Sequence, residues 1–533
     1  MKKKSKLLIA LVIIIFAGIY YYITLPAFNL HSTDTWFFVI ALIAALMVVY
    51  ALRKRIGKAE IKTDKGLKMF ITVILVLGVA FLVGTVLSSP IVNAKKYQQL
   101  MQVDEGDFSK DVEELSYDKI PLLDKDTASL LGDRKMGSMV DMVSQFEAEL
   151  IYSQINYKDN PVRVTPLRYA SVIKWFTNFG EGIPAYIRIN MATQSTELVK
   201  LTEGMKYTTS DHFNRNIYRH LRFAHPTYIY DTLSFEIDED GVPYWIAPVK
   251  KFNIGLFGGE TVGKVVICNA VTGEMETYDI ADVPQWIDNA YSADMLIKLF
   301  DYYGTLKHGF LNSVLSQRDC LATTDGYNYL ALEDDVWMYT GVTSVNGDQS
   351  NVGFVLSNKR TMDTKYYEVE GATETSAMSS AEGQVQNLGY RATFPLLLNI
   401  SGEPTYFIAL KDDAGLVKKY AMVNVHKYQI VAIGDSVSQC ETNYLELLFS
   451  NGVKQEAEDT REILTVEGKV TKIAQAVIDG TSHFYIMVEG SEDIFDLSVV
   501  EYIDVVKCEV GQKVKMEYKQ DEKVNPVLSF EIK

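Results

Sequence analysis

Reactive and metal-binding side chains are scarce in this sequence of 533 residues. The four cysteines, Cys268, Cys320, Cys440 and Cys508, stand in no C-x-x-C or Cys/His spacing, so neither a zinc site nor a disulfide framework is indicated. Free buried thiols are the favoured interpretation, and one bridge among the first three cysteines stays open. The G-x-S-x-G and H-E-x-x-H motifs are absent. We therefore expect no metal, no cofactor and no enzyme activity.

Charge is missing from three long apolar runs near the N-terminus. Leu7–Ile23, Trp36–Leu52 and Met69–Leu87 hold 17, 17 and 19 residues without Asp, Glu, Lys or Arg, close to the ~20 that a helix needs to cross a bilayer. We expect three membrane helices. A cleaved signal peptide is the alternative for the first run, but no A-x-A cleavage pattern follows it. Transport by the spans is another alternative, but they lack the intramembrane charges that mark a transport path.

The distribution of positive charge predicts the orientation. Residues 1–94 hold 11 Lys/Arg and 3 Asp/Glu, a net charge of +8, and the whole chain carries −16, so residues 95–533 carry −24. The N-terminal tail and the loop Arg53–Lys68 are basic, whereas Leu25–Thr35 has no Lys or Arg. The positive-inside rule then places the N-terminus in the cytoplasm and everything after Leu87 outside, in a multi-pass protein of the cell membrane. An acidic domain of this size repels phosphate backbones, so no nucleic-acid partner is expected.

Residues 161–440 repeat a pattern of a helix followed by antiparallel strands. Turns at Gly241, Gly326 and Gly402 each precede an aromatic-rich strand, and a weaker copy begins at Gly182. The partner strands of these hairpins are expected from Lys264, Val352 and Lys418, and matching turns at Thr272–Glu274 and Thr361–Asp363. Helices are expected at Asp126–Leu131, Leu167–Phe179, Ser292–Leu315 and Ala377–Leu388.

This pattern resembles a known family. The helix with its meander, and strands of the G-x-P-x-Y-x-[ILV] and V-N-x-x-T-G-E type, resemble the PepSY module of peptidase propeptides and membrane-anchored bacterial proteins. The overall layout is similar to uncharacterised three-span membrane proteins of Gram-positive bacteria. The resemblance covers residues 161–440, transfers no catalytic residue, and implies a binding or regulatory module.

The C-terminal part has the pattern of a small β-barrel. Five strands are expected at Ile463–Val477, His483–Val488, Ile494–Val499, Lys513–Tyr518 and Val527–Ile532. Five short strands at this spacing suggest an OB-like barrel. The acids Glu489, Glu492, Asp493 and Asp496 disfavour an oligonucleotide ligand, and oligosaccharide binding or simple docking stay open.

The predicted fold class is α+β, with three N-terminal transmembrane helices, tandem PepSY-like modules and an OB-like barrel. The predicted parts are a three-span anchor (1–90), a stalk leading into the first module (91–160), PepSY-like modules (161–290 and 291–440), a helical linker (441–461) and the barrel (462–533).

Few residues suggest a site. Gly258–Lys264 has the spacing of a phosphate-binding loop, but Val265 replaces the Ser or Thr that magnesium needs, so we expect a hairpin. Glu236–Gly241 imitates the start of a calcium loop, but Ala247 stands at its twelfth position, so we expect a turn. One basic cluster is a candidate ligand or anion pocket, with a solvated helix face as the alternative. It consists of His212, Arg219, His220, Arg222 and His225.

Together these patterns predict a non-enzymatic, membrane-anchored, extracytoplasmic binding or regulatory protein of the cell envelope. Its expected partners are the lipid bilayer and an envelope protein or cell-wall polymer. The alternatives are a cell-envelope hydrolase with an unrecognised active site, and a subunit of a membrane complex.

Overall fold

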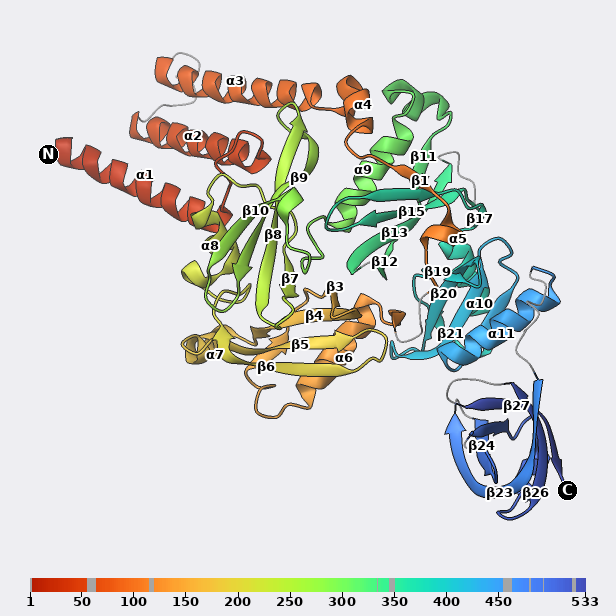
Figure 1. Ribbon diagram of the computed structural model, residues 1–533. Coiled ribbons are helices and arrows are strands. Elements are labelled where there is room, and N and C mark those ends of the chain that lie inside the picture. The colour runs from red at the N-terminus through yellow and green to blue at the C-terminus, as the bar shows by residue number, and fades with distance from the viewer. Residues whose placement is uncertain are drawn as a thin grey trace. The chain divides into compact units, whose positions relative to one another are not determined.

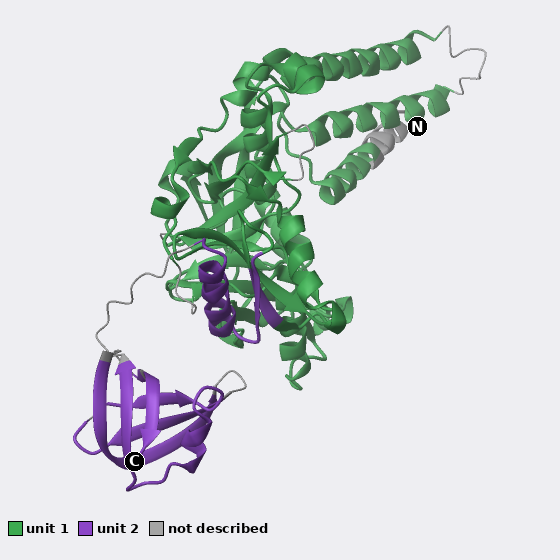
Figure 2. Cartoon of the chain, turned by 90° about the vertical axis from the view of Figure 1, so that its right-hand side faces the viewer, with its two compact units in different colours: residues 1–418, 423–429 green, residues 419–422, 430–533 purple. Residues whose placement is uncertain are grey.

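The chain forms a mixed α+β structure with three N-terminal helices (Figure 1). The computed structural model describes residues 2–54, 64–114, 119–332, 334–344, 350–453, 463–478, 481–491, 493–519 and 524–533. Two compact units are present, residues 1–418 with 423–429, and residues 419–422 with 430–533 (Figure 2). The α+β class expected from the sequence is therefore confirmed.

The N-terminal helices follow the three apolar runs. They are α1 (Lys2–Thr24), α2 (Thr33–Lys54) and α3 (Lys65–Leu87). By length and composition, α2 and α3 could each cross a membrane, and the apolar part of α1 among the described residues is the shorter stretch Ile13–Thr24. Asp64 caps α3 by accepting a hydrogen bond from the Leu67 backbone N–H (2.9 Å). Residues 55–63 of the predicted basic loop lie outside the described part of the chain.

Four sheets then follow one another, each preceded by a helix. The first module (residues 125–205) consists of α6 (Lys125–Gly137), β2 (Phe146–Ala148), β3 (Ser153–Tyr157), β4 (Asn160–Tyr169), α7 (Val172–Asn178), β5 (Ile183–Asn190) and β6 (Thr196–Met205). The second module (217–279) consists of α8 (Ile217–Ala224), β7 (Ser234–Ile237), β8 (Pro243–Ile254), β9 (Gly258–Asn269) and β10 (Met275–Asp279).

The third and fourth modules have the same antiparallel meander. The third (293–367) consists of α9 (Ala293–Thr305), β11 (Leu321–Thr323), β12 (Asn328–Leu332), β13 (Asp335–Ser344), β15 (Gly353–Asn358) and β16 (Thr364–Tyr367). The fourth (374–434) consists of α10 (Glu374–Gln384), β18 (Arg391–Ala392), β19 (Leu396–Ile400), β20 (Glu403–Lys411), β21 (Val417–Asn424) and β22 (Val431–Gly434). β14 (Ser350–Asn351) pairs with β17 (Gly371–Ala372), and α11 (Val437–Ser450) follows β22.

A shared turn joins the last two strands of the first three modules. Asn190, Asn269 and Asn358 each use their side-chain oxygen to accept hydrogen bonds from the backbone N–H groups two and three residues ahead (2.8–3.1 Å). The threonine three residues after each asparagine accepts a further backbone N–H. We call this the N-x-x-T turn. The turns expected at Thr272–Glu274 and Thr361–Asp363 are thus confirmed, and the weaker copy after Gly182 has the same turn.

Both faces of the second sheet are buried. Trp245 and Ala247 of β8 belong to a core shared with the first module, and Ile246 between them belongs to a core with α9. Successive strand residues point to opposite faces, so a sheet covered on both sides needs an almost continuous apolar run. In the fourth sheet, Tyr406 and Phe407 are adjacent residues of β20 and are also both buried.

The segment expected to be a stalk is packed. α4 (Pro90–Gln98) places Tyr97 against Tyr302 of α9, with ring centroids 4.7 Å apart. β1 (Asp104–Gly106) pairs in parallel with β16, and α5 (Phe108–Asp111) follows it. The polar and charged start of this segment suggested a stalk, but Tyr97, Met101 and Phe108 are buried.

Several predicted element ends are wrong. The helix expected at Leu167–Phe179 begins only at Val172, because Leu167–Tyr169 pair with β2. The helix expected at Ser292–Leu315 ends at Thr305, before the left-handed turn at Gly309 (φ +85°). The strand after Gly326 is β12, and its partner is β13 rather than the strand after Val352.

The C-terminal strands occupy the expected positions. They are β23 (Ile463–Ile478), β24 (Thr481–Val488), β25 (Phe495–Ser498), β26 (Lys513–Lys519) and β27 (Asn525–Ile532). They pair in the order β23-β24-β25-β27-β26, and β26 pairs back with β23. Their core includes Ile486, Phe495 and Val514. Residues 454–462 of the predicted linker and start of the barrel, and Glu492, lie outside the described residues.

Candidate functional site

The three histidines of the predicted basic cluster have separate protein partners. The His212 ring lies edge-on to Trp175 with centroids 4.5 Å apart, and the His225 ring stacks on Tyr228 at 4.6 Å. His220 forms a hydrogen bond between Nε2 and the Gly273 carbonyl (2.8 Å). Burial lowers the pKa of His225 and so favours its neutral form. The histidines therefore serve local packing, and the anion pocket stays a sequence-based prediction.

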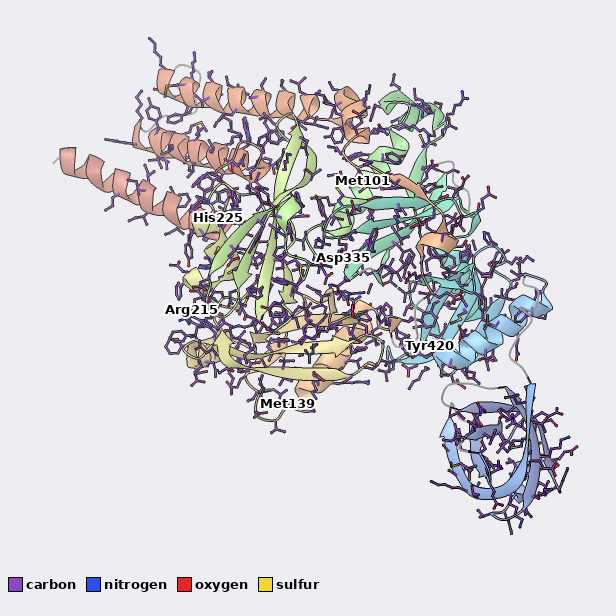
Figure 3. All side chains as sticks on the ribbon, viewed as in Figure 1. Met101, Met139, Arg215, His225, Asp335 and Tyr420 are labelled. Carbon is purple, nitrogen blue, oxygen red and sulfur yellow. The ribbon has the colours of Figure 1, made fainter. Side chains whose placement is uncertain are left out.

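The two arginines of the cluster contact the end of α1. The Arg219 guanidinium lies 4.6 Å from the centroid of the Tyr22 ring, and Arg222 Nε donates to the Leu25 carbonyl (2.9 Å). Phe223 packs its ring near Tyr21 and Tyr22. The structure therefore brings α8, which ends just before the His225 labelled in Figure 3, against the first apolar helix.

The loop between β8 and β9 makes a second contact with the apolar helices. Phe257 lies 5.0 Å from Phe81 of α3 and 6.1 Å from Trp36 of α2 between ring centroids. Ser88 Oγ accepts hydrogen bonds from the backbone N–H groups of Leu256 (2.8 Å) and Phe257 (3.1 Å). The residues of the apparent phosphate loop lie at the start of β9, so the expected hairpin is confirmed. The Asp240–Gly241 turn is confirmed too, because Asp238 accepts the Asp240 and Val242 backbone N–H groups.

One serine has a spacing that occurs in acyl-enzymes. Ser171 and Lys174 match S-x-x-K. Ser171 Oγ accepts a hydrogen bond from the Lys174 backbone N–H (3.3 Å) and thereby caps α7. This capping hydrogen bond explains the S-x-x-K spacing, so no catalytic role is assigned to the two residues.

A buried charge network lies where β3, β7 and β13 meet. Asp288 accepts hydrogen bonds from the backbone N–H groups of Asn156 on β3 (2.7 Å) and Val336 on β13 (3.1 Å). Glu236 on β7 accepts the backbone N–H groups of Asp288 (2.9 Å) and Asn289 (3.1 Å). The two carboxylates thus hold the edges of three modules together, because they satisfy N–H groups that no strand pairs.

Two basic residues of the third N-x-x-T turn balance these acids. Lys359 is 4% exposed and donates to Asn289 Oδ1. Arg360 makes a bidentate pair with Asp335, both N···O distances being 2.7 Å. Arg–carboxylate pairs of this geometry are among the strongest in proteins.

Burial shifts the pKa values in this network. It lowers the pKa of Lys359 to about 8, and it raises the pKa of Glu236. The pKa of Asp288 is raised well above its usual value by burial and then by the charge of Glu236. Desolvation penalises the charged form of each group. Burial therefore favours the neutral forms of Glu236, Asp288 and Lys359.

A cleft of about 260 Å³ reaches this network. Its lining includes Lys359, Asn289, Gln154, Tyr327 and Tyr329. Lys359 Nζ lies 4.3 Å from the centroid of the Tyr329 ring, and the Tyr327 and Tyr329 rings are 5.6 Å apart. The buried Gln154 Nε2 has no hydrogen-bond partner in the described structure. The cleft therefore offers a buried donor, a cation and two aromatic rings to a ligand with an acceptor group and a flat surface.

The hydrogen bonds of Glu236 and Asp288 indicate a structural role for both carboxylates, because each accepts backbone N–H groups from a neighbouring segment. Among the described residues, no group of three or more His, Cys, Asp or Glu side chains could hold a metal ion. The four cysteines are free and buried.

The sequence carried one overlooked signal for this site. The first two N-x-x-T turns read Asn190-Met-Ala-Thr and Asn269-Ala-Val-Thr, whereas the third reads Asn358-Lys-Arg-Thr. Two charged residues replace small or apolar ones at one copy of a repeat. Such a departure from the repeat indicates that these two positions have a role specific to the third module.

Comparison with known proteins gives no family for this chain. No family model matches it, and neither does any curated protein. Its function must be inferred from its own residues.

Proposed function

We propose that this chain is a membrane-anchored, non-enzymatic binding or regulatory protein of the cell envelope. Three spans would hold it, with the N-terminus in the cytoplasm and residues after Leu87 outside. The exported part would consist of four PepSY-like modules and an OB-like barrel. Its partner would be an envelope protein or a cell-wall polymer.

The contact between the loop Leu25–Thr35, which has no Lys or Arg, and the folded domain supports this topology. The Phe28 N–H donates to the Pro226 carbonyl (2.7 Å), Asn29 Nδ2 donates to the Thr227 carbonyl (3.0 Å), and His31 bonds to the Leu256 carbonyl (2.6 Å). The domain therefore packs at the helix ends that lack Lys and Arg. Because positive ends stay in the cytoplasm, these contacts belong outside.

The helix-plus-meander modules support the PepSY-like assignment, and the ring of five strands supports the OB-like one. The observation that carries the binding role is the cleft beside Lys359. It combines aromatic rings with a buried cation while the nearby carboxylates are engaged by backbone donors.

Chemical cross-linking of the intact chain in its membrane, followed by affinity purification, tests the binding role. Tyr327→Ala removes an aromatic ring from the cleft, and Tyr428→Ala is the matched control, since both rings are partly exposed (37% and 45%). We expect the wild type and Tyr428→Ala to recover one component repeatedly, and Tyr327→Ala to lose it. Equal recovery by both variants, or turnover of wall polymer by the purified protein, would contradict the proposal.

A labelling experiment tests the topology. Lys58→Cys, which lies outside the described residues, should resist an impermeant thiol reagent on intact cells, and Val140→Cys, 86% exposed, should react. The reverse result would overturn the orientation.

A further inference from the structure

An apolar surface lies bare on α7 and on the short 3-10 helix Phe213–Arg215. We call it the α7 patch, and it consists of Val172, Ile173, Phe176, Phe179 and Phe213. Their exposed fractions are 65%, 73%, 69%, 40% and 66%. Soluble proteins rarely leave a contiguous group of large apolar side chains in water.

Ring packing and a hydrogen bond fix the position of the α7 patch. Trp175 packs beneath it, with ring centroids 5.3 Å from Phe179 and 6.0 Å from Phe213. The Trp175 indole N–H donates to the buried Asp211 (3.1 Å). Phe213 keeps a left-handed backbone (φ +53°) with its ring exposed, and such strain persists only where the surroundings fix it.

The patch is continuous with the contact between the folded domain and α1. The 3-10 helix leads directly into α8, whose Arg219 and Phe223 lie against Tyr22 at the end of α1. Figure 1 shows α7 and α8 on the side of the domain from which α1 and α2 leave. Figure 3 shows Arg215 at this same edge.

The charges of the patch fit a lipid surface. Lys174 lies within α7, and Arg215 follows Phe213; the Arg215 guanidinium lies 5.9 Å from the Phe179 ring centroid. Interfacial helices combine bulky apolar side chains with basic ones, which extend towards lipid phosphates while their stems stay in the apolar layer.

We propose that the α7 patch inserts into the outer leaflet beside the spans, with Lys174 and Arg215 contacting lipid phosphates. This inference rests on the topology proposed above. Such insertion would give the domain a second attachment besides the helices and would fix its orientation on the bilayer.

Depth-dependent quenching on the full chain in lipid nanodiscs tests the inference. A bimane fluorophore on Phe176→Cys, and separately on Ile173→Cys, reports from the patch, and Val140→Cys, in the same module, is the exposed control. Val79→Cys on α3 reports the span itself. The quenchers are lipids with a nitroxide at the upper acyl chain, and aqueous iodide.

We expect the lipid nitroxide to quench the two patch labels several-fold more than the Val140 label, and iodide to show the opposite order. If the Val79 label is quenched but both patch labels behave like the Val140 label, the inference is wrong, whereas the assignment of α3 as a membrane span stands. If Val79 is not quenched either, the proposed membrane topology fails with it. Patch labels shielded from both quenchers would mean that protein, from a second copy or a partner, covers the patch, which also overturns the inference.

Discussion

At the scale of single residues, the asparagine of the N-x-x-T turn organises three of the four modules. Where the chain reverses, two backbone N–H groups have no strand partner, and the asparagine side-chain oxygen accepts their hydrogen bonds instead. The turn also needs a left-handed residue, which is Gly273 in the second module (φ +78°) and Met362 in the third (φ +69°). The sequence repeat is therefore a repeat of turn chemistry.

Asn269→Ala should lower stability by about 1–2 kcal/mol, because the backbone N–H groups of Val271 and Thr272 lose their acceptor in the turn. The measurement is thermal or denaturant unfolding of the full chain in detergent. Asn214→Ala, at an exposed asparagine, is the control and should change stability by less than about 0.5 kcal/mol. Equal effects of the two substitutions would mean that the turn needs no side-chain acceptor.

Lys359→Met should make stability depend more strongly on pH. Lys359 lowers the pKa values of Glu236 and Asp288, so its loss raises them further. A carboxyl whose folded pKa is raised holds its proton in the folded chain after the unfolded chain has lost it, so its contribution to stability falls as pH rises through that window. Lys359 itself, with a folded pKa of about 8 against 10.5 unfolded, contributes more stability as pH rises from about 8 to 10.5.

Unfolding temperatures of the full chain between pH 5 and 8 measure this effect. The Lys359→Met curve should fall away from the wild type with rising pH. Lys365→Met, at a partly exposed lysine paired with Asp111, should run parallel to the wild type. A Lys359→Met curve parallel to the wild type would show that the network does not couple to this lysine.

At the scale of elements, strand β8 separates two cores. Trp245 is fully buried on one face and donates its indole N–H to the Tyr207 carbonyl (2.8 Å). Tyr244 lies on the other face, partly buried, with its ring 5.1 Å from Trp286.

Trp245→Ala should therefore cost about 3–5 kcal/mol, the range for removing a buried aromatic side chain. Tyr244→Ala should cost clearly less, since its side chain keeps solvent contact. Denaturant unfolding of the two variants decides the order. Similar mild losses for both would contradict the division into two cores.

Sequence patterns predicted strands better than helix ends. Alternating and aromatic-rich runs placed β8, β20 and the C-terminal strands, because the period of a strand is visible in a short window. Leu167–Tyr169 were wrongly assigned to a helix, because their conformation depends on pairing with β2, which lies outside the local window of the pattern. The stalk prediction failed for the same reason, since β1 finds its partner far along the chain.

The candidate site was less accessible to sequence reasoning. Glu236, Asp288 and Lys359 come from three separate places, and only the packing of three modules brings them together. Local spacing gave His212 and its neighbours instead, because they are close in sequence. The pairing of Asp335 with Arg360 could not be inferred without the register of β13 and β15.

At the scale of the whole molecule, the C-terminal strands form a core from their own residues alone. A fragment of residues 463–533 should therefore fold without the rest of the chain. At this size its stability should be only a few kcal/mol.

Circular dichroism and amide chemical-shift dispersion of the isolated fragment measure its folding. Val514→Asp, at a fully buried position, should abolish the cooperative transition, whereas Val500→Asp, 81% exposed, should retain it. A wild-type fragment without a cooperative transition would show that the strands depend on another part of the chain.

The pairing of β1 with β16 has a consequence for biogenesis. Asp104 follows the last apolar helix closely, yet its partner Lys365 is synthesised 261 positions later, a delay of roughly 10–50 s at ordinary translation rates. Under the proposed topology, the newly exported chain would have an unpaired strand segment tethered at the translocation site during that interval. A nascent chain stalled before residue 364 cannot close the third sheet, and this segment should make it a substrate for quality-control proteases at the membrane.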